Sequence, residues 1–276
     1  MAEDLRILMV GLSESGKTTF LAALYELARA EPPLPGALRL VQEPAERDYF
    51  HRIAQNWLKL ERMLHTQPGD PRDAAMELIT PDGQSFQLEI PDISGEDFNH
   101  AWEGEPWPGP VEDVAARADA ILIFARRDHV IKPLSLPADD AAPPAEDKEE
   151  WSPEEAPTQS KLADLLETLD SLVSRPLPMA LIASAWDMSN GEEELRPDQW
   201  LKFRLPLLWQ MLESRKETRP YRVYGVSAQG GDVEDPEVRA RLAEIEPAYE
   251  RVDVRSGENA SSDISAPISW LFEQIQ

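Results

Sequence analysis

The chain has 276 residues, of which 42% are hydrophobic, so it can bury a substantial core, and we expect one domain over residues 1–276. Its 52 acidic and 27 basic residues give a formal net charge of −25, which argues against nucleic acid and anionic membranes as partners, because phosphate contacts need Lys and Arg. The chain has no cysteine, no basic leader before an apolar stretch and no apolar run long enough to cross a membrane, so we expect a cytoplasmic protein.

Residues 11–18 read GLSESGKT and follow a short apolar run at 5–10 that predicts a buried strand. The octet fits the pattern G-x-x-x-x-G-K-[ST] of phosphate-binding loops, and the apolar residues at 19–28 predict a helix directly after it. In this pattern the glycines let backbone N–H groups surround a polyphosphate, Lys17 reaches the β and γ phosphates, and the Thr18 hydroxyl ligates Mg²⁺. The alternative interpretation is a Gly- and Ser-rich connector that holds no ligand.

The next elements form an edge of the predicted sheet. Residues 37–41 indicate a short strand, and residues 44–64 carry apolar side chains at helical spacing. Residues 75–79 and 86–90 alternate around a Pro-Asp-Gly-Gln turn, which predicts a hairpin. The remaining predicted elements are strands at 118–125, 178–184 and 221–227, helices near 159–174 and 197–214, and an amphipathic helix at 266–276.

Strands that alternate with helices predict an α/β fold in three layers, whose sheet is mostly parallel with one antiparallel edge strand. Two acidic segments interrupt this pattern. Residues 131–158 are expected to be a Pro-rich, disordered insertion, and residues 231–263 an acidic loop with one short helix at 237–244. Neither composition offers enough apolar surface to offset the entropy of ordering the chain.

The predicted strands at 86–90, 179–184 and 221–226 lead into residues that suit a nucleotide, and ligands of open α/β sheets bind at the carboxyl ends of the strands. After the strand at 86–90, Asp92 can hold a water of bound Mg²⁺, and the Gly95 N–H can approach a γ-phosphate. After the strand at 179–184, Asp187 can accept hydrogen bonds from the N1–H and exocyclic amine of guanine, a donor pair that adenine lacks. Each of these residues is also an ordinary turn or capping residue.

The four motifs in this order resemble those of the translation-factor-like and Ras-like P-loop GTPases. Residues 11–18 resemble the phosphate loop and residues 92–95 the D-x-x-G motif. Residues 184–187 resemble an N-K-x-D motif with Ser for Asn and Ala for Lys, and residues 227–228 resemble the S-A motif whose small residues admit the guanine O6. The whole chain is most similar to bacterial double-GTPase-type domains.

The resemblance implies a P-loop GTPase-like fold, with Mg²⁺ and GTP or GDP as cofactors. It also implies a small GTPase domain that works with other proteins in a larger bacterial system, of the kind linked by genomic context to conflict and defence. The metal-binding residues that it implies are Thr18, Asp92 and Thr66. The nucleotide-binding residues that it implies are Gly11, Ser13, Glu14, Ser15, Gly16, Lys17, Thr18, Thr19, Gly95, Ser184, Asp187, Ser227 and Ala228.

Departures from the family pattern leave several roles open. Ala185 cannot cover a base as the family's Lys does, so Trp186 or another aromatic residue would have to do so. Thr66 lies in the interval where the family's Thr closes over Mg²⁺, but an ordinary loop residue also fits there. Glu96 follows Gly95, where Ras-like GTPases often carry a water-orienting Gln; its carboxylate either orients the attacking water or is repelled by the γ-phosphate.

Two further features have alternative interpretations. Arg126 and Arg127 follow the strand at 118–125 and either stabilise transition-state charge or pair with the many acidic residues nearby. Trp102 and Trp107 lie after the D-x-x-G motif and mark either a partner surface or ordinary packing.

Three functions are therefore compatible with the sequence. The leading hypothesis is a Mg²⁺-dependent GTP-binding switch with slow hydrolysis, in which Lys17 and Glu96 are catalytic and the γ-phosphate orders residues 92–108. The second is a nucleotide-bound scaffold without turnover that binds proteins through the switch region and the acidic loops. The third is an ATP-specific ATPase or kinase, because the phosphate loop itself does not read the base.

Overall fold

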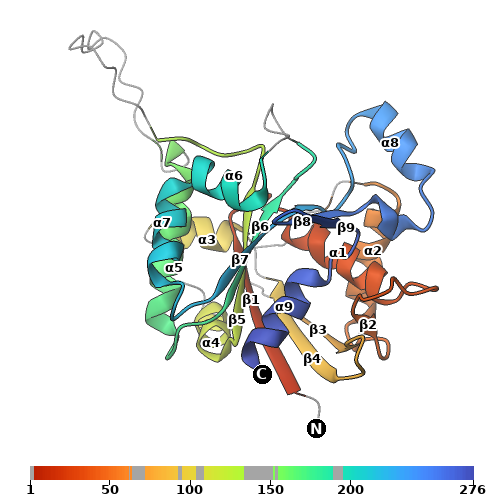
Figure 1. Cartoon of the computed structure of the whole chain (residues 1–276), viewed down its shortest axis with the longest axis horizontal. Coiled ribbons are helices and arrows are strands. Elements are labelled where there is room, and N and C mark those ends of the chain that lie inside the picture. Colours follow the sequence, from red (N-terminus) through yellow and green to blue (C-terminus); the bar gives the residue numbers. More distant parts are fainter. Residues whose placement is uncertain are drawn as a thin grey trace.

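One sheet runs through the part of the chain that the computed structural model describes (Figure 1). The described residues are 3–61, 63, 72–92, 95–103, 109–133, 152, 155–188 and 195–276. The strands of the sheet are β1 (Glu3–Gly11), β2 (Arg39–Leu40), β3 (Arg72–Ile79), β4 (Ser85–Asp92), β5 (Ala120–Arg126), β6 (Met179–Ser184), β7 (Tyr221–Ser227), β8 (Asp253–Ser256) and β9 (Asn259–Ser261).

These nine strands are ordered β2-β3-β4-β1-β5-β6-β7-β8-β9. The central strands β4, β1, β5, β6 and β7 run parallel, whereas β2 and β3 at one edge and β8 and β9 at the other are antiparallel. The predicted α/β class with a mostly parallel sheet is confirmed. The prediction of one antiparallel edge is incomplete, because antiparallel strands lie at both edges.

Helices cover both faces of the sheet and make three layers. Figure 1 shows α3 to α7 on one face and α1, α2 and α9 on the other. The alternation of β1 explains this arrangement: Leu5, Ile7 and Met9 face one buried apolar core, and Leu8 and Val10 face the other. The helices are α1 (Lys17–Ala28), α2 (Arg47–Leu58), α3 (Gly95–Trp102), α4 (Gly109–Arg117), α5 (Thr158–Leu172), α6 (Pro197–Arg204), α7 (Pro206–Arg215), α8 (Pro236–Ala243), the short 3₁₀ helix η2 (Ala248–Arg251) and α9 (Ala266–Ile275).

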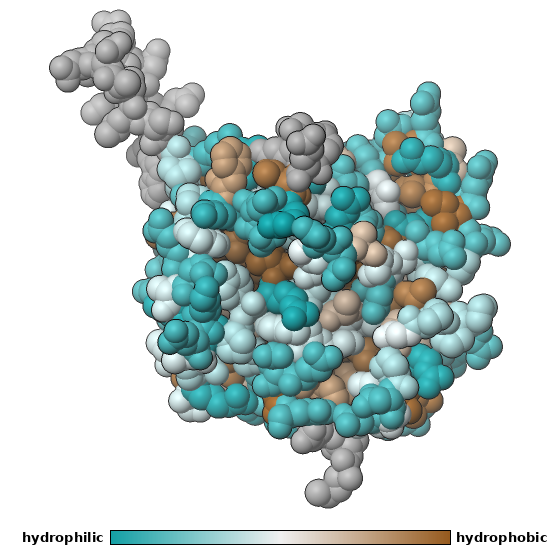
Figure 2. Space-filling view, in the orientation of Figure 1, coloured by the Kyte–Doolittle hydropathy of each residue, from teal (hydrophilic) through white to brown (hydrophobic). Residues whose placement is uncertain are grey.

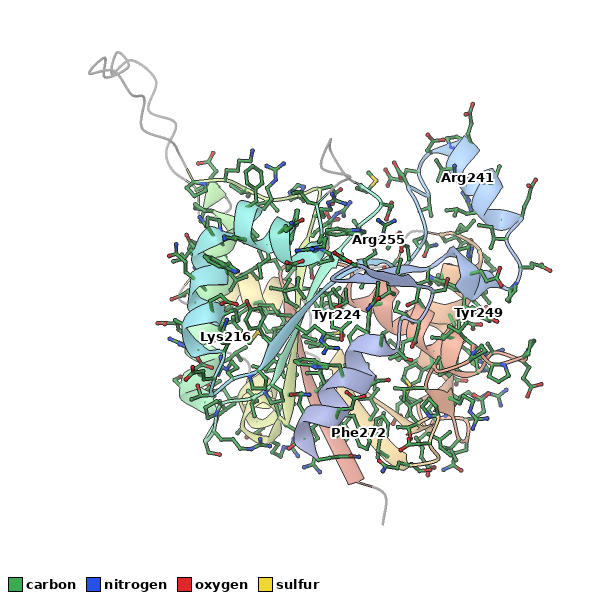
Figure 3. All side chains as sticks on the ribbon, in the orientation of Figure 1. Lys216, Tyr224, Arg241, Tyr249, Arg255 and Phe272 are labelled. Carbon is green, nitrogen blue, oxygen red and sulfur yellow. The ribbon has the colours of Figure 1, made fainter. Side chains whose placement is uncertain are left out.

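The predicted hairpin and the predicted C-terminal helix are confirmed. β3 and β4 pair antiparallel, and the turn between them closes with a hydrogen bond of 2.9 Å from the Thr80 N–H to the Gln84 carbonyl. Gly83 in this turn has a φ of 91°, a left-handed conformation that favours glycine. Phe272 of α9 stacks on Phe86 of β4 at 4.3 Å between ring centroids, so the last helix packs against the sheet (Figure 3).

Several predicted elements differ from the structure. The helix predicted at 44–64 is shorter, because α2 spans Arg47–Leu58. The single helix predicted at 197–214 is two helices, α6 and α7, that meet at Leu205 and Pro206, because proline lacks an N–H and disfavours helical backbone in the residue before it. Helices α3 and α4 follow Gly95, in a segment where the sequence analysis predicts no helix.

The acidic segment 231–263 is also more ordered than its composition predicts. It contains the expected helix as α8, but residues 253–261 form the hairpin of β8 and β9 instead of a loop. The reason is tertiary: β7 offers a free backbone edge, and Val252 and Val254 are buried in the same core as Tyr249, which Figure 3 labels in η2. Of the expected insertion 131–158, residues 134–151 and 153–154 lie outside the described residues, so this prediction stays untested.

The surface drawn in Figure 2 is mostly hydrophilic, with apolar side chains in small groups, in keeping with the net charge of −25. No helix within the described part of the chain is both long and apolar enough to span a membrane.

Candidate functional site

The predicted motifs meet at one edge of the sheet. Gly11 at the end of β1 pairs with Phe124 of β5, and Arg126 at the end of β5 pairs with Ser184 at the end of β6. Ser184 pairs in turn with Val226 of β7, the residue before Ser227. The parallel register therefore brings together the carboxyl ends of four strands that are far apart in the sequence, as the sequence predicts.

The loop between β1 and α1 has the backbone that a phosphate loop needs. Gly16 caps α1 with a φ of 89°, in the left-handed region that glycine tolerates best. A Cβ on Gly11 would lie 2.7 Å from the Ser15 Oγ and 2.9 Å from the Phe124 Cβ, so no larger residue fits there. Both glycines of the pattern are therefore required by the local geometry. The N–H groups at the start of α1 lie at the positive end of the helix dipole.

Lys17 lies inside this loop. Its Nζ donates hydrogen bonds to the Gly11 carbonyl at 2.7 Å and to the Leu12 carbonyl at 3.2 Å. The side chain is 7% exposed, and the ammonium group lies 5.6 Å from the centre of the Phe98 ring. The two carbonyls hold the positive charge at the loop, where it can meet a bound phosphate.

The start of α3 packs directly on the loop. A Cβ on Gly95 would lie 2.5 Å from the Ser13 N and Cα, so the two backbones are in contact there. Phe98 of the same helix is buried above Lys17, and Glu96 lines a hollow beside Ser13. The sequence did not single out Phe98; its place three residues after Gly95, on one face of a helix, is the signal that could have identified it.

The predicted metal-binding residues are only partly placed. Thr18 lies in the first turn of α1, and Asp92 is the last residue of β4, the parallel neighbour of β1. Thr66 lies outside the described residues, so its role stays a prediction. Hydroxyl and carboxylate oxygens are the ligands that Mg²⁺ prefers, so Thr18 and Asp92 fit this ion chemically. No group of three or more His, Cys, Asp or Glu residues that could hold a metal occurs among the described residues.

The segment 184–187 is tied to the loop despite its departures from N-K-x-D. The Ser184 Oγ donates a hydrogen bond of 2.7 Å to the Ser15 carbonyl of the loop. The Asp187 carboxylate accepts a hydrogen bond from the Ser227 hydroxyl, which itself accepts one from the Gly230 N–H at 3.1 Å. The structure thus joins Ser184 to the loop and Asp187 to Ser227.

Trp186 does not lie over this site, so the expectation that it covers a base is wrong. Its side chain is 4% exposed and belongs to the apolar core on the opposite face of the sheet. A Cβ on Gly225 would lie 2.3 Å from the ring, and the ring also contacts Trp200 edge-on. Ala185, directly before Trp186, has a φ of 50°, in the left-handed region, and residues 186–187 form a turn, so the ring leaves the alternation of β6 and enters the core.

Of the two arginines at the end of β5, only Arg126 reaches the site. Arg127 is buried, donates a hydrogen bond of 2.6 Å to the Trp186 carbonyl and lies 4.0 Å above the Trp186 ring. Arg126 pairs with Asp128, and this hydrogen bond, together with the attraction of Glu14 and Asp187, raises the pKa of Arg126. The structure therefore supports pairing with local acidic residues for Arg126 and a structural role for Arg127.

A hollow of about 430 Å³ lies between the loop and the ends of β5, β6 and β7. Gly16 and Thr19 line it on the side of the loop, and Ala228 and Gln229 line it on the side of β7. Trp57 of α2 supports this side, because its Nε1 donates to the Ala228 carbonyl at 2.8 Å while the Gln229 amide donates to the Trp57 carbonyl at 3.2 Å. The hollow therefore extends from Gly16 of the loop to Asp187.

A comparison with protein families matches most of the chain. The family model described as DO-GTPase1, Double-GTPase 1, matches residues 8–271, a range that contains all four motifs. No curated protein matches the chain in sequence.

Several solved structures are similar to this chain at low identity. The Arl6 BBS3 small GTPase of Trypanosoma brucei, with the bound nucleotide analogue GppNp, is 10% identical with a TM-score of 0.49, and the match covers 99% of this chain and 97% of that one. The bacterial selenocysteine-specific elongation factor EF-Sec is 14% identical with a TM-score of 0.39, over 91% of this chain and 30% of that one. The signal recognition particle receptor SRb-GTP/SRX complex of Chaetomium thermophilum is 14% identical with a TM-score of 0.45, over 83% of this chain and 92% of that one.

Proposed function

The chain belongs to the Double-GTPase 1 family, and from this membership we propose that it is a Mg²⁺-dependent switch that slowly hydrolyses GTP to GDP and phosphate. As a member of a GTPase family it binds a guanine nucleotide. The observation that carries the proposal is the position of Lys17, whose ammonium group is held at the loop by the Gly11 and Leu12 carbonyls. In this geometry the backbone N–H groups of the loop and the Lys17 charge act on the same phosphates.

The chemistry of the donors supports the proposed Mg²⁺ dependence. Thr18 would ligate the ion directly and Asp92 through a water molecule, with Thr66 as a further ligand. The ion would offset the repulsion between a polyphosphate and the acidic residues of the site. Lys17 and Thr18 then act on the same phosphates from two sides.

We expect Asp92→Asn to weaken GTP binding at least about tenfold in Mg²⁺, because an amide holds a metal-bound water less well than a carboxylate. In EDTA the variant and the wild type should bind GTP equally. Isothermal titration of GTP in both buffers measures the two affinities. An equal loss in Mg²⁺ and in EDTA would mean that Asp92 only supports the end of β4.

The switch element of the proposal is α3. Gly95 contacts the Ser13 backbone, and Phe98 covers Lys17, so α3 closes the loop on the side where a γ-phosphate would extend. A triphosphate needs room between Gly95 and the loop, so its binding would move the start of α3 outward. Loss of the γ-phosphate would let α3 return, and residues 95 to about 108 would report the nucleotide state.

Glu96 is the residue that we propose to orient the attacking water. It lies one residue after Gly95 and lines the hollow beside Ser13, next to the expected γ-phosphate. We expect the wild type to turn over GTP slowly and Glu96→Ala to lower the rate at least about tenfold, the lower part of the range for an oriented acid–base group. Phosphate release under single-turnover conditions measures the rate.

Three results of this experiment are informative. Equal GTP affinity with a lower rate in Glu96→Ala supports the role in hydrolysis. A higher rate would mean that the carboxylate repels the γ-phosphate and slows the reaction. If the wild type binds GTP without any turnover, the protein is a nucleotide-bound scaffold.

We further propose that the switch acts on other proteins in the bacterial cytoplasm, as one part of a larger assembly of the conflict or defence type, and not on nucleic acid or membranes. The net charge of −25 supports partners with basic surfaces. The partners would contact α3 and the acidic loops, so their binding should differ between the GTP and GDP states. Pull-down with the protein loaded with GDP or with a non-hydrolysable GTP analogue tests this dependence.

A further inference from the structure

We propose that Arg126, from the end of β5, covers the nucleobase and thereby takes over the task of the Lys that residues 184–187 lack. The inference rests on the proposed guanine-nucleotide site and adds a specificity-determining residue to it. Ala185 occupies the position of the family's Lys and has no side chain that could reach a base. Trp186 is buried on the opposite face of the sheet. The covering group must therefore come from another element.

Arg126 is placed where such a group is needed. It is the register partner of Ser184 in the neighbouring parallel strand, and paired residues of neighbouring strands point to the same face. Ser184 points to the loop, as its hydrogen bond to the Ser15 carbonyl requires. Arg126 lines the same hollow as Glu14, Ala185 and Asp187, and the carboxylates of Glu14 and Asp187 attract its charge.

The orientation of the guanidinium group is fixed before any ligand binds. The Arg126 Nε donates to one Asp128 carboxylate oxygen at 2.8 Å, and its Nη2 donates to the other at 3.0 Å. Such a two-point contact holds the guanidinium plane and reduces the entropy that would be lost on stacking. A planar guanidinium group can stack on the face of a purine and also attract its π electrons. An ammonium group attracts the π electrons as a point charge but has no plane to stack.

The negative charge of the hollow also favours a cation at the position of Arg126. Its lining carries five carboxylates, from Glu14, Glu61, Asp187, Asp232 and Glu234. Arg126 is the one Arg or Lys among the residues that line it in the described part of the chain. A bound nucleotide adds further negative charge, so a base-covering group in this hollow is most favourable when it is positive. Arg126 meets the requirements of position, plane and charge together.

The test compares a ligand with a base and a ligand without one. Affinities for GDP and for pyrophosphate, the latter by competition with a fluorescent GDP analogue, are measured for the wild type, Arg126→Ala, Arg126→Lys and Asp128→Ala. We expect Arg126→Ala to weaken GDP binding about tenfold and pyrophosphate binding less than about twofold, because a cation–π contact acts on the base alone. Arg126→Lys should recover part of the loss, and Asp128→Ala, which frees the guanidinium plane, should show a smaller loss than Arg126→Ala.

Arg175→Ala serves as the control, because it removes the same charge from an arginine that pairs with Asp119 on the surface. Unchanged GDP affinity in a folded Arg126→Ala would overturn the proposal, as would an equal loss for GDP and pyrophosphate, which would place Arg126 at the phosphates. A larger loss in His129→Ala, another residue of the hollow, would assign the base to His129 instead. If Arg126→Ala does not fold, Arg126→Lys and Asp128→Ala decide the question. Failure of the wild type to bind GDP would instead overturn the proposed function itself.

Discussion

Lys17→Ala is expected to lower GTP affinity by at least about a hundredfold while the protein stays folded. The ammonium group is held at the loop by the Gly11 and Leu12 carbonyls, and a charged hydrogen bond to a phosphate contributes about 1.5–3 kcal/mol. Since 1.4 kcal/mol is about a tenfold change, contacts with two phosphates account for the expected loss. Phe98 and the loop backbone stay in place, so we expect only a small change in the midpoint of thermal unfolding.

Titration calorimetry with GTP measures the loss, and circular dichroism during heating confirms the fold. Lys216→Ala is a matched control, because it removes the same charge from an exposed residue after α7, labelled in Figure 3, that pairs with Glu213. A folded Lys17→Ala with the affinity of the wild type would refute the assignment of residues 11–18 as a phosphate loop. A variant that no longer folds would show that the two carbonyl contacts mainly stabilise the loop, and Lys17→Arg would then separate charge from geometry.

The second large effect concerns the base. We expect the wild type to prefer GTP over ATP by about a hundredfold or more, because adenine leaves the Asp187 acceptors without donors, and each unpaired polar group costs about 1–3 kcal/mol. Asp187→Asn exchanges a double acceptor for an amide that both donates and accepts. This variant should lose most of the preference for GTP and gain affinity for xanthine nucleotides, which carry a carbonyl where guanine has its amine.

The contact of Asp187 with Ser227 makes this variant a mild one for the fold. The Asn carbonyl oxygen can still accept the hydrogen bond of the Ser227 hydroxyl, so the link between β6 and β7 should persist. Asp232→Asn, in a carboxylate of the same hollow, controls for the change in charge. Competition binding with GTP, ATP and XTP gives the ratios. Equal affinity of the wild type for GTP and ATP, unaltered by Asp187→Asn, would make the protein a general purine-nucleotide binder and would leave the phosphate site unaffected.

Local chemistry explains what could be predicted from the sequence. The octet at 11–18 is identifiable because its glycines allow the backbone conformation that a phosphate loop needs. The structure confirms the strand before the octet and the helix after it. The hairpin of β3 and β4 follows from its turn residues, and β5 and β6 follow from continuous apolar runs. The resemblance to double-GTPase-type domains, which the family match over 8–271 confirms, also depends on such short motifs.

Contacts between distant parts of the chain determine the orientation of the site residues and the fold of the acidic segment 231–263. Ser184 can hold the phosphate loop because the sheet places its hydroxyl against the carbonyl of Ser15, a residue 169 positions earlier in the sequence. Arg126 faces the hollow because its register partner Ser184 faces the loop, and a shift of one residue would turn it to the other face. Trp186 enters the core because the backbone turns at Ala185, whose φ is 50°. The hairpin of β8 and β9 forms from an acidic sequence because β7 supplies a free edge and the core buries Val254. Composition and spacing describe neighbours along the chain, whereas register and burial are set by strands that meet only in the folded sheet.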